Sequence, residues 1–304
     1  MTSAHSRLPG RSWQSASIRT GLTAYTFLLP ALSLFIFFEL FSLIYNLYVG
    51  FHSWSGFGDP KFVGFDNYIS LSDDSMFWKA FWNNMIFMAV ALFIMTPLSL
   101  FIAIILDSEI PGASFFRALL FLPVIIPTIV VGLVWTRIFS SQSGLLNQGL
   151  EAIGLVSLQH DWLGDPNTAL GAVLVVWVWR HLGYGVVMFS AALLSIPNDL
   201  KDAAVLDGAT PSQTVMQVIL PLVRPVVLIV GIWFAILAFK VFALVYIMTN
   251  GGPFHATEVM NTYMYKRVFL FFKMGVGSAI TNIVLLVLLG LAVLRGRFNS
   301  TYEY

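Results

Sequence analysis

Length, composition and charge place this chain in a membrane. It has 304 residues, of which 58% are apolar and only 10% are charged, and its mean hydropathy is +0.83. A soluble domain carries about 25% charged residues, so a soluble domain is excluded, and so is intrinsic disorder, which requires low hydrophobicity. The net charge of +1 gives no basic field for nucleic acid, and the lack of cysteine excludes disulfides and cysteine-ligated metals. We therefore predict an all-α polytopic protein of the cell membrane, in contact with its lipid.

Six apolar stretches are long enough to cross the hydrocarbon core as helices, which takes about 20 residues. They are Leu22–Val49, Asn84–Leu106, Phe115–Phe139, Ala169–Leu194, Pro225–Thr249 and Gly275–Leu294. The basic N-terminal tail and the Arg295/Arg297 pair after the last stretch place both termini in the cytoplasm. We expect a transmembrane domain over residues 22–297, with cytoplasmic tails at 1–21 and 298–304.

Prolines interrupt several of these predicted spans. Pro97, Pro123 and Pro127 each lack a backbone N–H. Each therefore leaves the carbonyl four residues earlier without its helical partner, and that carbonyl must find another one within the membrane. Kinked helices favour a moving pore over a passive anchor.

Sequence signatures of enzymes are missing. There is no G-x-x-x-x-G-K-[ST] loop, no H-E-x-x-H and no G-x-S-x-G, and the five histidines are scattered over different segments. We therefore predict no catalytic residues, no metal site and no cofactor in this chain.

The segment after the fourth span, residues 195–224, is the most informative one. Asn198 is placed to cap a short helix, and Asp199 and Asp202 fall in its first turn, where the helix dipole favours acids. Gly208 is expected to end that helix in a left-handed conformation.

A second helix start follows the glycine directly. Thr210 is expected to be the N-cap, Pro211 takes the first helical position, and Gln213 completes a capping box. One face of the first short helix has small side chains at its centre, which let another protein approach closely. On physical grounds alone, a structured connector remains an equal alternative to a docking site.

The same segment resembles a known family. The run Asp-Ala-Ala-x-x-Asp-Gly-Ala, with its later Leu-Pro pair, is similar to the E-A-A-x-x-D-G-A signature of membrane subunits of bacterial ABC importers. The matching residues are Asp202, Ala203, Ala204, Asp207, Gly208, Ala209, Leu220 and Pro221. The resemblance implies that they form a cytoplasmic coupling loop seated in a groove of the ATPase subunit. Asp202 stands where glutamate is usual, and Val215 where an aromatic residue is common.

Further segments resemble the carbohydrate-type permeases of this family, over roughly residues 20–297. They are Val63–Tyr68, Arg117–Pro123, Trp135, Gly144–Asn147 and Thr249–Pro253. The resemblance implies a permease subunit for a sugar or sugar-like solute. It also implies a second, related permease chain, two ATPase subunits that bind ATP and Mg, and an extracytoplasmic solute-binding protein. The alternative is a secondary carrier driven by an ion gradient, a class that often shows the inverted repeats we do not find here.

Three charges lie inside the predicted spans: Glu39, Arg180 and Lys240. Each is about 9–11 residues from the outer end of its span, or roughly 13–17 Å deep at 1.5 Å per residue. We expect Glu39 to pair with one cation, leaving the other to face the solute path or backbone carbonyls. A static brace between helices and a gate both remain open.

Four aromatic side chains in the spans are candidates for stacking on a sugar along the solute path. They are Trp177, Trp179, Tyr184 and Phe242. Packing or anchoring at the membrane interface is the more common role of membrane aromatics.

Overall fold

The computed structural model describes residues 25–107 and 111–299, and for residues 294–299 it describes the backbone alone. The expected tail at 1–21 lies outside the described residues, as do residues 300–304. Within the described ranges, five helices have the length and hydropathy of membrane spans, and two further helices form a bent pair. The five are Tyr25–Gly50, Ser75–Asp107, Ala169–Leu194, Pro211–Phe239 and Met274–Val293. The predicted all-helical membrane fold is confirmed.

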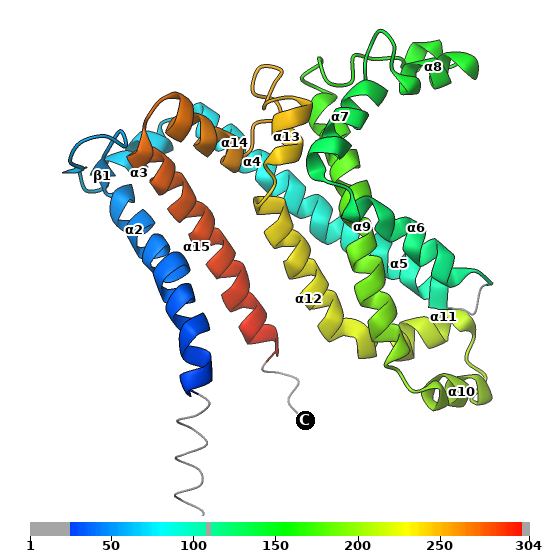
Figure 1. Ribbon diagram of the computed structural model, residues 1–304. Helices are drawn as coiled ribbons and strands as arrows, with labels where there is room; N and C mark the ends of the chain where they lie inside the picture. The colour runs from blue at the N-terminus through cyan, green and yellow to red at the C-terminus, as the bar shows by residue number, and fades with distance from the viewer. Residues whose placement is uncertain (1–24, 108–110, 300–304) are drawn as a thin grey trace, which may run out of the picture.

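Shorter elements gather at the two ends of the bundle (Figure 1). One end, called the lower end here, holds α10 (Asn198–Leu206) and α11 (Pro211–Thr214). The first span begins on this side of the molecule, and the last span ends on it. The opposite, upper end holds a hairpin in which β1 (His52–Ser53) pairs antiparallel with β2 (Lys61–Phe62). The upper end also holds α3 (Asp66–Ser72), α8 (Leu145–Ala152), α13 (Ala243–Met248) and α14 (Met260–Tyr265). The short turn η3 (Val156–Leu158) follows α8.

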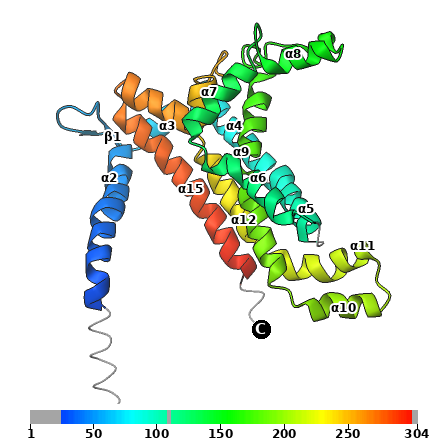
Figure 2. The same ribbon diagram turned by 45° about the vertical axis from the view of Figure 1, so that its right-hand side comes forward.

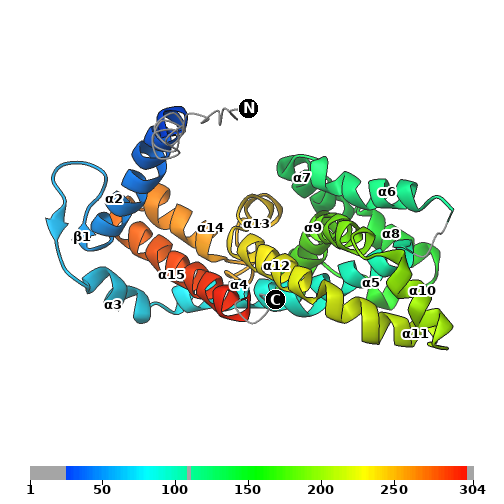
Figure 3. The same ribbon diagram turned by 90° about the horizontal axis from the view of Figure 1, so that it is seen from below.

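The first span stands at the rim of the molecule, as the view from below shows (Figure 3). Its most apolar window is 0% buried within this chain. It contains a π-helical turn, η1 (Phe35–Leu40), and then α2 (Phe41–Gly50), which packs against α15 (Met274–Asn299). There Asn46 Nδ2 donates a hydrogen bond to Asn282 Oδ1 at 2.7 Å. Most of this helix therefore presents apolar surface that its own chain leaves uncovered.

The second span begins at Ser75 rather than at Asn84, which corrects the prediction. It consists of α4 (Ser75–Val90), the π-helical turn η2 (Ala91–Met95) and α5 (Thr96–Asp107). Asp74 caps it by accepting a hydrogen bond from the Met76 amide at 2.9 Å, so the helix starts before the apolar run does. Pro97 cannot donate to the helical ladder. Just before it, the Ala91 carbonyl accepts from both the backbone N–H and the hydroxyl of Thr96, the hydroxyl at 2.8 Å.

The third predicted span, Phe115–Phe139, is wrong as a single helix. It is divided into α6 (Ala113–Ile125) and α7 (Thr128–Ile138), which meet at 97°. Ile126 precedes Pro127 and takes an extended backbone, φ −67° and ψ 132°, because the proline ring excludes the helical conformation before it.

The fourth span, α9, has the predicted bounds Ala169–Leu194. The fifth differs from the predicted Pro225–Thr249, because it runs from α11 through the π-helical turn η4 (Val215–Ile219) and α12 (Leu220–Phe239), where it ends. Lys240 is its C-cap, and α13 is a separate helix. The sixth, α15, follows the π-helical turn η5 (Lys266–Leu270).

The main core surrounds α9. Its largest side chains, Phe87, Trp177, Phe189 and Phe234, are at most 1% exposed and join α4, α9 and α12. The backbone of α6 also lies directly on α9, since a Cβ at Gly183 would stand 2.4 Å from the Leu120 carbonyl oxygen. A smaller core at the upper end joins α3, α4, α14 and α15. α9 is thus the element on which α5, α6 and α12 pack, whereas the first span packs on α15.

Candidate functional site

Helices α10 and α11 form a hairpin that projects from the lower end (Figure 2). Helix α10 contains no buried residue, and its Leu206 and Val205 side chains are 87% and 64% exposed. Pro197 is its N-cap, so Asn198 is the first helical residue and not the cap that the sequence predicted. An exposed helix that carries large apolar side chains is a surface suited to a protein partner.

The junction between the two short helices follows the prediction. Gly208 has φ +82°, a left-handed conformation that disfavours any side chain. The Thr210 amide donates to Gln213 Oε1 at 2.8 Å, and the Gln213 amide donates to Thr210 Oγ1 at 3.4 Å. This is the predicted capping box, with Pro211 in the first turn. The hairpin therefore has a defined backbone conformation at the junction of its two helices.

The signature residues are distributed along this hairpin. The exposed members are Asp202, Ala203, Asp207 and Gly208 on the first half and Pro221 on α12. The half-buried members are Ala204, Ala209 and Leu220. Leu220 and the unusual Val215 pack against the main core. The acidic and small residues therefore lie at the surface, and the later Leu-Pro pair joins the hairpin to the fifth span.

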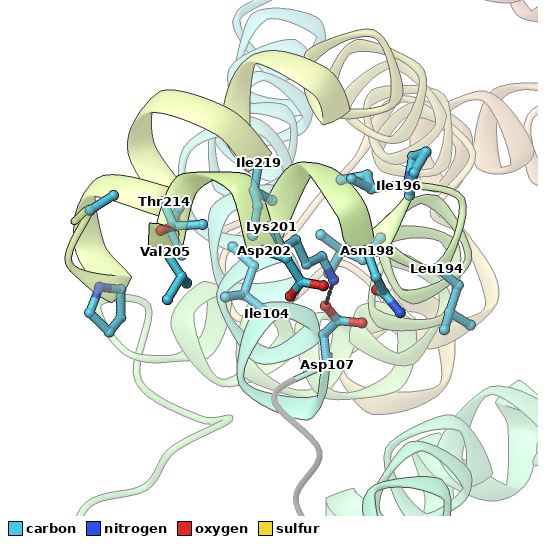
Figure 4. A pocket seen from close by; sticks show the side chains of 15 residues that line it. Ile104, Asp107, Leu194, Ile196, Asn198, Lys201, Asp202, Val205, Thr214 and Ile219 are labelled. Atoms are coloured by element: carbon cyan, nitrogen blue, oxygen red, sulfur yellow. Dashed lines mark hydrogen bonds and ion pairs between the residues drawn. The ribbon is translucent and has the colours of Figure 1, made fainter. Parts of the chain in front are cut away.

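A groove of about 1110 Å³ lies between α10 and the lower ends of α5 and α9 (Figure 4). Its wall is mainly apolar, with Ile104, Leu193 and Ile219 among the lining residues. Asp107, Lys201 and Asp202 are its charged members. Across this groove Lys201 Nζ and Asp107 Oδ2 form an ion pair at 2.7 Å.

A second cavity lies inside the bundle, where the two broken spans both touch α9. It measures about 140 Å³. Thr128 lines it from the start of α7, and Lys240, Val241 and Phe242 line it from the break after α12. From α9 come Trp177, Arg180 and His181. Among the described residues that line this cavity, the charged side chains are basic.

Arg180 is bonded to the bend between α6 and α7. Its Nη1 donates to the carbonyls of Pro123 at 3.0 Å and Ile126 at 2.5 Å. The ring of Pro127 disrupts helical bonding there, and the guanidinium satisfies the freed acceptors. One of the expected cations therefore does face backbone carbonyls.

The expected pairing of Glu39 with Arg180 or Lys240 is wrong. Glu39 lies in η1, none of whose residues is buried, and the ion pairs found among the described residues do not include it. Lys240 lies at the end of a helix and is exposed. The pairing fails because Lys240 lies beyond the end of the fifth span at Phe239 and the first span stands away from α9.

The four candidate aromatic residues occupy two kinds of position. Trp177 and Phe242 line the cavity, although Trp177 is also packed edge-to-face on Phe87 at 5.4 Å. Trp179 packs against Trp135 at 5.4 Å, and Tyr184 packs against Phe121 at 5.8 Å. Neither Trp179 nor Tyr184 is among the residues that line the cavity.

Sequence reasoning missed the side chains that hold the break after α12. Asn84 Nδ2 donates to the Ala238 carbonyl at 2.8 Å, and Asn261 Nδ2 donates to the Phe239 carbonyl at 2.9 Å. It also set aside His181, whose Nδ1 lies 2.8 Å from the Trp177 carbonyl. An asparagine inside an apolar run was the available signal, because a buried amide needs partners.

The upper end carries a cluster of charged and polar groups that joins α4 to α14 and η5. Asp74 accepts hydrogen bonds from the Tyr263 hydroxyl and from Arg267 Nη2. Burial works to raise the pKa of Asp74, but those hydrogen bonds, the Met76 amide and the Arg267 charge together lower it below its ordinary value. Nearby, the fully buried Glu258 pairs with Lys266 at 2.7 Å.

No group of three or more His, Asp or Glu side chains in the described ranges is placed to hold a metal ion.

Comparison with known proteins identifies a family. Residues 95–299 match the family described as the binding-protein-dependent transport system inner membrane component. The probable ABC transporter permease protein YurN of Bacillus subtilis is 35% identical over 280 residues, 91% of this chain and 96% of that protein. The diacetylchitobiose uptake system permease protein NgcF of Streptomyces coelicolor is 32% identical over 280 residues, 88% of this chain and 79% of that protein.

The fold also matches a solved structure. One chain of a bacterial ABC transporter involved in the import of the acidic polysaccharide alginate has a TM-score of 0.82 to this chain. The two are 20% identical, and the match covers 96% of this chain and 100% of that one. At this level of identity the likeness concerns the fold.

Proposed function

The chain belongs to the family of binding-protein-dependent transport system inner membrane components, and from this premise we propose how its parts work. It is a permease subunit of an ABC importer in the cell membrane. In the proposal it forms half of the translocation pathway for a sugar or sugar-like solute, within a permease domain over residues 22–297. The comparisons give no support to a carrier driven by an ion gradient.

The loop at 195–224 is proposed as the contact with an ATPase subunit, which binds and hydrolyses ATP with Mg. The observation that carries this role is the exposed helix α10, with no buried residue and a left-handed junction at Gly208. In this arrangement Ala203 and Asp207 face the ATPase, and Asp202, which lines the groove between α10 and the bundle, helps to order the loop that makes this contact. The lower end is then cytoplasmic, which agrees with the expected side of both termini, because the first span begins and the last span ends toward that end (Figure 1).

A second, homologous permease is proposed to cover the first span. That helix has a 0% buried apolar window and carries Glu39 in a turn without buried residues. A charge left in hydrocarbon costs at least about 2.5 kcal/mol, so Glu39 needs a polar partner, and the part of the chain that the structure describes does not provide one. The complete importer would contain two permeases, two ATPase subunits and an extracytoplasmic solute-binding protein docked at the upper end.

The solute is proposed to pass the cavity between the two broken spans. Phe242 lines that cavity with a partly exposed ring that also stacks on Tyr246 at 5.4 Å, and aromatic rings suit sugar rings. Support for the sugar class comes from the diacetylchitobiose permease among the relatives. Trp177 forms part of the same wall, whereas Trp179 and Tyr184 have packing roles.

Uptake into proteoliposomes tests the function. The complex is reconstituted with its binding protein and a labelled sugar, with ATP inside, in the presence and absence of an ionophore. The proposal predicts uptake that requires ATP and survives the ionophore. Uptake that needs an ion gradient and ignores ATP would contradict it.

The pathway has its own test within the same assay. Phe242→Ala should raise the sugar concentration that gives half-maximal uptake, because a stacking face is lost. Trp179→Ala, a change of similar kind outside the cavity, should leave that concentration unchanged. Equal effects of both variants would remove the cavity from the pathway.

A further inference from the structure

The ion pair between Lys201 and Asp107 is the polar link between α10 and the second span. Lys201 Nζ lies 2.7 Å from Asp107 Oδ2, and the two side chains are 25% and 14% exposed. Figure 4 shows the pair bridging the groove, with Asp202 beside it. Because no residue of α10 is buried, apolar packing does not fix this helix to the bundle.

The lower end of α5 is a junction for two other elements. Lys201 reaches it from α10, and Arg117 reaches it from α6, where its Nη2 donates to the Leu106 carbonyl at 2.9 Å. Cations are favoured at this place because the C-terminal end of a helix carries partial negative charge. A displacement of α10 that carries Lys201 with it therefore acts on the last turn of α5.

The part of the second span between Ser99 and Asp107 lies within α5, below the π-helical turn, and this continuous helix can carry such a displacement further. It also lies close against α9, since a Cβ at Gly185 would stand 2.4 Å from Ser99 Oγ. A force on Asp107 would thus reach the helix that contributes Arg180 and Trp177 to the inner cavity.

We propose that Lys201 and Asp107 are positioning residues that transmit movement of α10 to the second span during ATP-driven transport. This inference rests on the proposed role of the 195–224 loop as the ATPase contact. The pair adds a direct link from α10 to a span that does not adjoin it in the sequence. A pair that merely stabilised the fold would change the amount of assembled complex and leave the coupling of ATP hydrolysis to transport intact.

The test compares charge neutralisation with charge exchange in the whole reconstituted importer. The variants are Lys201→Gln, Asp107→Asn, and the exchanged double variant Lys201→Asp with Asp107→Lys. Asp73→Asn, which removes an exposed charge outside the 195–224 loop, is the control. Three quantities are measured: complex yield, basal ATP hydrolysis, and solute transported per ATP hydrolysed.

Transmission through the pair predicts normal yield and basal hydrolysis in every variant. Solute transported per ATP should fall by about threefold to fivefold in each single variant, which corresponds to the loss of one partly exposed ion pair. It should recover in the exchanged variant and stay unchanged in Asp73→Asn.

Two results would overturn the inference. One is single variants that couple as the wild type does, and the other is single variants that fail to assemble, because the pair would then be a structural brace. A wild-type complex that hydrolyses ATP without any response to solute would instead contradict the proposed function itself.

Discussion

Arg180 holds the carbonyl of Ile126 at 2.5 Å, across the bend that separates α6 from α7. The same nitrogen accounts for the Pro123 carbonyl, so one guanidinium satisfies two acceptors at a break inside a membrane span. An unsatisfied carbonyl within the hydrocarbon region of a membrane costs several kcal/mol. The 97° bend therefore depends on a side chain from another helix.

Replacing Arg180 should destabilise the protein. Arg180→Gln loses charge-assisted hydrogen bonds, each worth about 1.5–3 kcal/mol, and should lower the melting temperature of the purified chain in detergent. Arg180→Lys keeps one charged donor group, so its melting temperature should lie between those of the wild type and of Arg180→Gln. Lys240→Gln, at an exposed cation lining the same cavity, is the control and should melt as the wild type does. A wild-type melting temperature for Arg180→Gln would show that the bend does not need this side chain.

Close packing of α6 on α9 gives a second prediction. Gly183→Ala places a Cβ 2.4 Å from the Leu120 carbonyl oxygen, so the two helices must separate. Overpacking of this kind costs about 1–3 kcal/mol and should reduce thermal stability. The matched control is Gly171→Ala on the same helix, where a Cβ meets nothing within 4 Å. Equal melting curves for the two variants would contradict the packing described for Gly183.

Gly208→Val should leave assembly of the importer intact but impair the coupling of ATP hydrolysis to solute. A side chain in the left-handed conformation costs about 1–2 kcal/mol, although the space around Gly208 is open. The helix end should therefore rearrange at the surface without unfolding the bundle. We expect normal complex yield and loss of solute-stimulated ATP hydrolysis.

The control for this variant is Gly154→Val, at φ +80° and in equally open space, but after α8 at the upper end. It carries the same conformational penalty far from the ATPase contact, so its stimulated hydrolysis should be normal. If both valine variants lose stimulation, the effect is not specific to the 195–224 loop.

The Asp74 cluster predicts a pH dependence of stability. The pKa of Asp74 is lower in the folded protein than its ordinary value of 3.8, so folding favours the ionised carboxylate. Its contribution is complete above about pH 4 and is lost as the pH falls through the lowered pKa. Asp74→Asn should have a lower melting temperature than the wild type at neutral pH. Its melting temperature should also fall less on acidification than that of the wild type. Asp73→Asn, an exposed neighbour, should retain the wild-type pH profile.

Sequence patterns predicted the features that are determined by residues close together in the sequence. The fourth span has the expected bounds because an unbroken apolar run is flanked by turn formers, and the Thr210–Gln213 box formed because capping is local. The break after Phe239 was missed because the apolar run continues through α13, and hydropathy cannot locate a helix end inside it. Asn84 and Asn261 stabilise that break from distant parts of the sequence. The Glu39 pairing failed because depth within a span does not specify which helices are neighbours.

Contact between α10 and an ATPase subunit is the central claim, and site-specific crosslinking measures it most directly. The chain has no cysteine of its own, so Ala203→Cys, on the exposed part of α10, provides one reactive position. Leu145→Cys, 68% exposed at the upper end, is the control. The account predicts a crosslink to the ATPase from Ala203→Cys and none from Leu145→Cys in the assembled importer. An intact complex in which Ala203→Cys fails to crosslink while Leu145→Cys does would contradict both the coupling role and the orientation.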